Sequence, residues 1–149
     1  MSDESSSIPA SPLCVDANLV VRFLTDPDDV AIQRHWRSWR NDEQTFIAPF
    51  LFRYEVTNAL YRLGRADKEN VIDMTPTLHA AFALPIELYQ DKALHAAAMK
   101  LASRFNLSAA YDAHYLALAD NLGVEFWTAD KKLANPVRHS LPWVHLIES

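Results

Sequence analysis

The alternation of short apolar runs with longer segments of helical spacing most constrains the fold of this chain. Short apolar runs bounded by turn residues are typical of buried strands, and apolar positions that recur every three or four residues predict helices. Strands that alternate with helices favour an α/β domain with a mostly parallel sheet. The expected strands are Leu13–Val15, Phe46–Ala48, Pro85–Tyr89, Val124–Thr128 and Trp143–Ile147.

The segments between these runs have helical spacing. Gly64 and Gly123 are the only glycines of the chain, and each follows an apolar helical pattern as a predicted stop. Pro76 predicts that its segment forms two helical pieces, because proline does not fit an undisturbed helix interior. Ser108 is the expected N-cap of the last helix. The expected helical segments are Leu19–Leu24, Val30–Trp39, Phe50–Leu63, Ala66–Leu84, Asp91–Phe105 and Ala109–Leu122.

A length of 149 residues favours one domain. Residues 1–12 are rich in serine and poor in apolar side chains, which predicts a flexible tail before a single domain at 13–149. No apolar run approaches the roughly 20 residues of a membrane span, and no basic-then-apolar signal opens the chain, so we expect a cytoplasmic protein. Cys14 is the single cysteine, which excludes an internal disulfide and a zinc site built from cysteines.

The net charge of −5 argues against a protein that coats nucleic acid by charge alone. Local arginine groups can still hold a phosphate, and Arg40 and Arg53 are the candidates for substrate binding. The alternative for both is a solvated helix face. Aromatic side chains that are candidates for base stacking, with core packing as the alternative, are Trp36, Trp39, Tyr54 and Trp127.

Several common catalytic motifs are absent. The two glycines cannot form a glycine-rich phosphate loop or a dinucleotide fingerprint. The six histidines show no His-x-x-x-His pair, and no serine lies in a Gly-x-Ser-x-Gly turn. Nucleotide-binding, zinc-hydrolase and serine-triad interpretations are therefore weak.

Four acidic residues lie where an apolar element meets a polar position: Asp16, Glu55, Asp112 and Asp130. Asp16 and Asp130 each follow an expected strand, and the carboxyl ends of parallel strands form pockets at one sheet edge. Each acid also has a structural interpretation, as a cap, a helix-dipole partner or a turn residue. Gathered together, two carboxylates about 5 Å apart would repel by roughly 3 kcal/mol at an effective dielectric near 20, so a hard divalent cation would be needed among them.

Two polar residues strengthen this interpretation. Asn58 lies three positions after Glu55 and therefore on the same helix face. The Thr128 hydroxyl, two residues before Asp130, is placed to orient that carboxylate.

Four sequence blocks resemble the PIN-domain ribonucleases, and most of all the VapC-type toxins of bacterial and archaeal toxin–antitoxin modules. The resemblance extends from Leu13 to Ile147, with the blocks in the family's order. The blocks are Val15–Asn18, Glu55–Leu60, Leu107–Ser108 followed by Tyr111–Ala119, and Thr128–Leu133.

The resemblance implies a three-layer α/β/α fold and an Mg²⁺- or Mn²⁺-dependent endoribonuclease that hydrolyses RNA with a metal-activated water. The quartet would supply the catalytic and metal-binding residues, with Asn18 and Thr128 in supporting polar positions. It also implies a small antitoxin as partner and a homodimer. Two departures are the longer serine-rich start and Pro76, which interrupts a region that the family keeps helical.

Two other functions remain open from the sequence. One is a phosphohydrolase with Asp16 as nucleophile, although such enzymes carry a second aspartate where this chain has Asn18. The other is a PIN-like domain that binds RNA or assembles with partners without catalysis.

Overall fold

The computed structural model describes residues 11–148, so the predicted tail, except Ser11 and Pro12, lies outside the described residues. Its centre is a five-stranded sheet in the order β3-β2-β1-β4-β5. All four strand pairings are parallel, which confirms the predicted α/β class. The strands are β1 (Leu13–Val15), β2 (Phe46–Pro49), β3 (Ile86–Tyr89), β4 (Phe126–Thr128) and β5 (Val144–Leu146).

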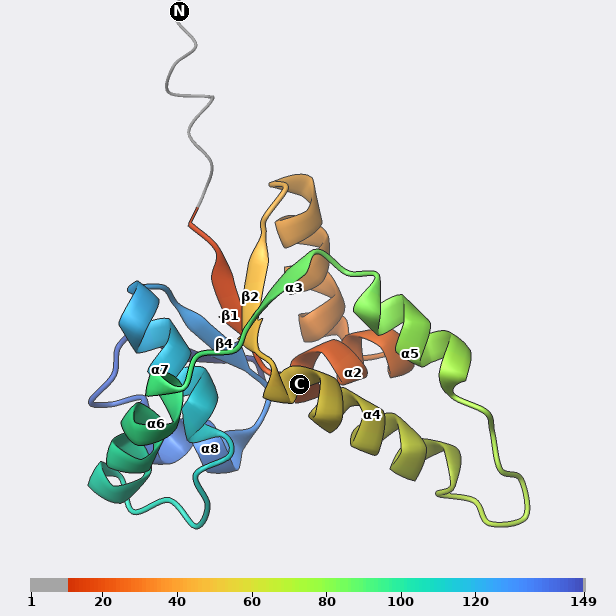
Figure 1. The fold of residues 1–149 in the computed structure, drawn as a ribbon. Coiled ribbons are helices and arrows are strands. Elements are labelled where there is room, and N and C mark those ends of the chain that lie inside the picture. Colours follow the sequence, from red (N-terminus) through yellow and green to blue (C-terminus); the bar gives the residue numbers. More distant parts are fainter. Residues whose placement is uncertain (1–10, 149) are drawn as a thin grey trace, which may run out of the picture.

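Seven helices within the described residues flank this sheet in two layers. Helices α2 to α5 lie on one side and α6 to α8 on the other (Figure 1). This arrangement is the expected three-layer α/β/α fold. The helices are α2 (Ala17–Thr25), α3 (Val30–Asn41), α4 (Leu51–Gly64), α5 (Thr75–Phe82), α6 (Ala93–Arg104), α7 (Ala113–Leu122) and α8 (Lys131–Val137).

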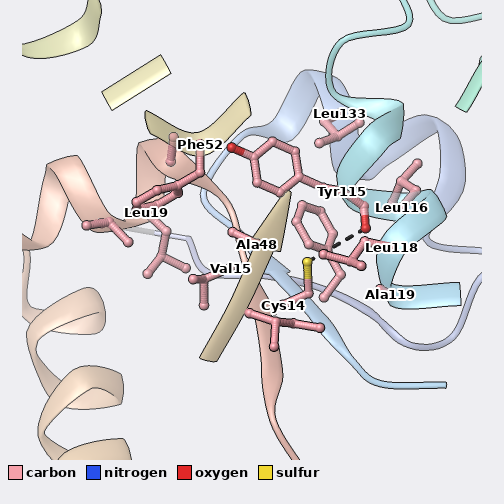
Figure 2. Packing of buried hydrophobic residues seen from close by; sticks show 14 of the residues in the cluster. Cys14, Val15, Leu19, Ala48, Phe52, Tyr115, Leu116, Leu118, Ala119 and Leu133 are labelled. Carbon is pink, nitrogen blue, oxygen red and sulfur yellow. Dashed lines mark hydrogen bonds between the residues drawn. The ribbon is translucent and has the colours of Figure 1, made fainter. Parts of the chain in front are cut away.

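The core fills both faces of the central strands. Every residue of β2 is buried, and Cys14 and Val15 of β1 are fully buried. Helix α7 has an unbroken buried run, Tyr115–Ala119, because it lies between the sheet and α6 and is covered on both sides. Figure 2 shows the Tyr115 ring lying in the core between α7 and the helix that carries Phe52. The Cys14 thiol contacts the Tyr115 carbonyl oxygen at 3.7 Å and is buried, as expected.

Two of the candidate stacking tryptophans belong to this core. Trp36 and Trp39 are only 4% and 8% exposed, and Trp36 stacks on Phe23 and Phe46 with ring centroids 4.5 and 5.0 Å apart. Core packing was therefore the correct interpretation for both, because α3 turns its aromatic face toward the sheet. Trp127 is half-buried and stacks on His145 at 4.5 Å.

The segment 66–84 differs from the prediction. It holds one helix, α5, and Pro76 lies in its first turn, where the missing N–H costs nothing. Gly64 is the last residue of α4, and the backbone at Ile72 passes close to it. A Cβ at position 64 would overlap the Ile72 carbonyl oxygen and lie 2.9 Å from Met74 Cγ. Gly123, with φ +66°, is a left-handed helix stop as predicted.

Helix α7 begins at Ala113, four residues later than predicted, so Ser108 does not cap it. Asp112 occupies the N-cap position but its side chain makes no capping hydrogen bond, which leaves the carboxylate available for other contacts. Helix α8 was not predicted, because Pro136 lies inside it. Across residues 11–148, no helix is long and apolar enough to cross a membrane.

Candidate active site

The four acids come from four separate segments and line one pocket. Asp16 follows β1 and Asp130 follows β4, and these strands are hydrogen-bonded neighbours. Glu55 lies in the second turn of α4, and Asp112 directly precedes α7. The pocket has a volume of about 260 Å³, and its other lining residues are Ala17, Asn18, Asn58, Ala59 and Arg62. The structure therefore brings together the whole predicted quartet.

Asp16 is the most buried of the four acids, at 4% exposure. Burial raises the pKa of its carboxyl from 3.8 to about 8, because a desolvated charge is unfavourable. The Thr128 hydroxyl opposes this shift by donating to Asp16 Oδ2 at 2.7 Å. The negative charges of the other three acids raise the pKa further. Without a nearby cation, this carboxyl holds its proton at neutral pH.

Glu55 and Asp112 form a coupled pair. Burial raises the pKa of both carboxyls, and a hydrogen bond between them raises the pKa of Glu55 and lowers that of Asp112. The buried Tyr115 hydroxyl donates to Glu55 Oε1 at 2.6 Å and favours the ionised form of Glu55. Tyr115 was not among the candidate site residues selected from the sequence.

Asp130 combines the two interpretations that the sequence left open. Its Oδ1 accepts the Lys132 backbone N–H at 2.9 Å and so caps α8. Its own backbone N–H donates to Thr128 Oγ1 at 2.9 Å. Asp130 is thus a helix cap and a pocket-lining acid at once.

The predicted polar neighbours surround these acids. Thr128 is fully buried, and its hydroxyl donates to the Asp16 carboxylate and accepts the Asp130 backbone N–H, so it orients Asp16 and not, as predicted, the Asp130 carboxylate. Asn18 Oδ1 accepts the Ala129 N–H at 3.4 Å and connects α2 to the end of β4. Asn58 lines the acid pocket one turn after Glu55.

The arginines are arranged differently from the prediction. Arg40 lies in the last turn of α3, close to the start of β2, and hence at the sheet edge opposite the acids. Arg53 is exposed and sits over the rings of Phe50 and Phe82, at 5.3 and 5.4 Å, outside the acid pocket. Arg62, which belongs with Arg53 to the basic group that flanks Glu55 in the sequence, does line the pocket, seven residues after Glu55 on the same face of α4.

The donor chemistry of this pocket fits a hard divalent cation, because carboxylate oxygens are the ligands that Mg²⁺ and Mn²⁺ prefer. Burial and the mutual repulsion of the acids raise the pKa values of Asp16, Glu55 and Asp112, and a bound cation would oppose both effects. Between residues 11 and 148, however, no three His, Cys, Asp or Glu side chains already surround a metal-sized point. The acids share a pocket but are not closed into a preformed coordination shell.

A parallel sheet with two acids at the carboxyl ends of neighbouring strands, and two more on helices beside them, defines an α/β protein with an acidic site. The PIN domain profile matches residues 13–138, and the chain therefore belongs to the PIN domain family, a nuclease superfamily.

Two solved structures share this fold. One is the crystal structure of PAE2754 from Pyrobaculum aerophilum, at 20% identity and a TM-score of 0.63, covering 92% of this chain and 90% of that one. The other is a toxin–antitoxin complex from Klebsiella pneumoniae, at 16% identity and a TM-score of 0.61, covering 90% and 95%. No curated protein matches the sequence. At these identities, the likeness supports the fold alone.

Proposed function

We propose that this protein is an Mg²⁺- or Mn²⁺-dependent endoribonuclease and the toxin of a toxin–antitoxin pair. The observation that carries the proposal is the convergence of Asp16, Glu55, Asp112 and Asp130 on one pocket of a PIN domain. The similarity in fold to a protein from a toxin–antitoxin complex supports the toxin role.

Asp16 and Asp112 would hold the cation directly, and Glu55 and Asp130 would complete the donor set. When bound, the cation would supply Lewis-acid chemistry that neutralises phosphate charge and makes a water more acidic. Burial raises the pKa of both Glu55 and Asp112, and a carboxyl with a raised pKa is suited to exchange a proton with a reacting group. Arg62 adds a positive charge to the pocket and is the residue best placed to pair with a phosphate oxygen.

The partner would be a small antitoxin with a basic side chain that enters the pocket. Such a side chain would relieve the repulsion among the acids, as a cation does. We also propose a homodimer and a cytoplasmic location, which are the remaining expectations from the sequence.

The test is cleavage of a mixed RNA pool with Mn²⁺ or with EDTA, for the wild-type protein and Asp16→Asn. Asp120→Asn is the matched control, because Asp120 is exposed on α7 and does not line the acid pocket. We expect cleavage by the wild type and by the control in Mn²⁺ only. Cleavage by Asp16→Asn at the wild-type rate would refute the assignment of the site.

The open arrangement of the acids favours one alternative, a PIN domain that binds RNA without hydrolysis. Calorimetric titration with Mn²⁺ separates the two functions, because only the nuclease requires a metal-linked heat and thermal shift. The other alternative, a phosphohydrolase in which Asp16 attacks phosphorus, would be supported only by a phosphoryl group trapped covalently on Asp16.

A further inference from the structure

A second pocket, of about 380 Å³, lies at the carboxyl end of β2 and β3. We call it the aromatic pocket, because rings form much of its wall. The residues that matter here are Phe50, Tyr54, Tyr89, His95, Tyr111 and His114. None of them lines the acid pocket.

The chain joins the two pockets directly. Tyr54 precedes Glu55, and Tyr111 precedes Asp112, so two walls of the aromatic pocket are the immediate neighbours of two acids. Consecutive α-carbons are about 3.8 Å apart. Both tyrosines are 67% exposed, so their rings are accessible to a ligand. The two pockets are therefore neighbours along the chain at two places.

A histidine pair fixes one side of the aromatic pocket. His114 Nδ1 lies 2.9 and 3.0 Å from the carbonyl oxygens of Ala110 and Tyr111, so this nitrogen carries the hydrogen. In the neutral ring, His114 Nε2 then accepts from His95 Nδ1 at 3.0 Å. His95 Nε2 is left as an acceptor at the exposed end of the pair. The pocket thus combines aromatic walls with a polar atom, as an aromatic heterocycle requires.

A cation stands at the rim of the same pocket. The Arg53 guanidinium lies 5.3 Å from the centre of the Phe50 ring, and Phe50 packs edge-on against Tyr54 at 6.2 Å. A nucleotide offers a base for the rings and a phosphate for the guanidinium. An apolar side chain of a protein partner has no negative group that could pair with the Arg53 guanidinium.

We propose that the aromatic pocket binds an unpaired nucleobase of the RNA next to the bond that is cut. Tyr54 and Tyr111 stack on the base, and Arg53 pairs with a flanking phosphate. This inference rests on the proposed nuclease function and deepens it. A base held in a duplex cannot enter such a pocket, so the substrate is single-stranded or looped RNA.

Binding of a short, fluorescently labelled single-stranded RNA of mixed sequence, measured by anisotropy in EDTA, tests the proposal without cleavage. Tyr54→Ala and Tyr111→Ala should each raise Kd about 5- to 150-fold, the range for loss of one base–aromatic stack. Tyr54→Phe and Tyr111→Phe keep the ring and should stay within about threefold of the wild type. Tyr61→Ala is the matched control, because Tyr61 lies on the same helix at 62% exposure and outside the aromatic pocket.

An unchanged Kd for both alanine variants, or no RNA binding by the wild type, would overturn the proposal. So would a loss of partner-protein binding in these variants with RNA affinity intact, which would make the pocket a protein-docking site.

Cleavage assays in Mn²⁺ distinguish this failure from failure of the proposed function. If the wild type cleaves RNA and Tyr54→Ala keeps its KM, only the base pocket is wrong. If the wild type does not cleave, the nuclease assignment is wrong, and anisotropy still decides whether the base binds.

Discussion

Replacing Asp16 with asparagine should stabilise the metal-free protein while removing its proposed activity. Asn keeps an oxygen that can accept from the Thr128 hydroxyl, which donates to Asp16 at 2.7 Å. It removes the charge that burial disfavours and that Glu55, Asp112 and Asp130 repel. A residue whose replacement stabilises the protein but removes its activity is one selected for function at the expense of stability.

The magnitude follows from the pKa of Asp16. Below pH 3.8 the carboxyl is protonated in both the folded and the unfolded chain. As the pH rises above 3.8, the Asp16 carboxyl ionises in the unfolded chain but not in the folded one, and this ionisation stabilises the unfolded state relative to the folded state. The effect stops growing once the folded carboxyl ionises, near pH 8. Each pKa unit corresponds to about 1.36 kcal/mol, so the full shift is equivalent to about 6 kcal/mol. The pocket opens to solvent and can relax around the charge, so we expect about 2–4 kcal/mol at pH 7.

Urea unfolding in EDTA at pH 5, 6, 7 and 8 would measure this difference. The free energy of unfolding of Asp16→Asn should exceed that of the wild type by about 1 kcal/mol at pH 5, and the difference should grow up to pH 8. The exposed control Asp120→Asn should change the unfolding free energy by less than about 0.5 kcal/mol throughout. A variant less stable than the wild type at pH 7, or a difference that does not grow with pH, would refute the reasoning.

Three further substitutions test single contacts. Tyr115→Phe removes the donor to Glu55, so the pH profile of RNA cleavage should move upward and the rate fall roughly 10- to 100-fold, as stopped assays across pH would show. Thr128→Val removes a buried hydroxyl with two partners and should cost about 1–3 kcal/mol in urea unfolding. Gly64→Ala should cost about 1–3 kcal/mol, because its Cβ meets the Ile72 carbonyl; an unchanged unfolding midpoint would contradict the close approach.

Local patterns were sufficient to predict the order of the strands and the positions of the acids. Each predicted strand forms, because short apolar runs between turn residues have few other ways to be buried. Asp16 and Asp130 were placed correctly at one sheet edge, since their strands are parallel neighbours. Glu55 and Asp112 were selected because each lies where an apolar helix meets a polar position, and the family resemblance then assigned all four acids to one site.

Contacts between distant segments were not predictable in this way. Tyr115 reaches Glu55 across 60 positions, and nothing in the local pattern separates this tyrosine from its apolar neighbours. Arg40 was selected from a basic run, but the direction of α3 carries it to the opposite edge of the sheet. Helix α8 was not predicted, and Pro136 in its last turn removes one backbone hydrogen-bond donor, so only contacts outside the segment can account for this helix.

The order of the strands also determines when the acid pocket can exist during synthesis. Strand β1 lies between β2 and β4, yet β4 is translated more than a hundred residues after it. Until β4 emerges from the ribosome and pairs with β1, Asp130 is absent and Asp16 lacks the hydroxyl of Thr128. A nascent chain therefore carries no complete quartet until the segment that holds β4 and Asp130 has been translated and has paired with β1.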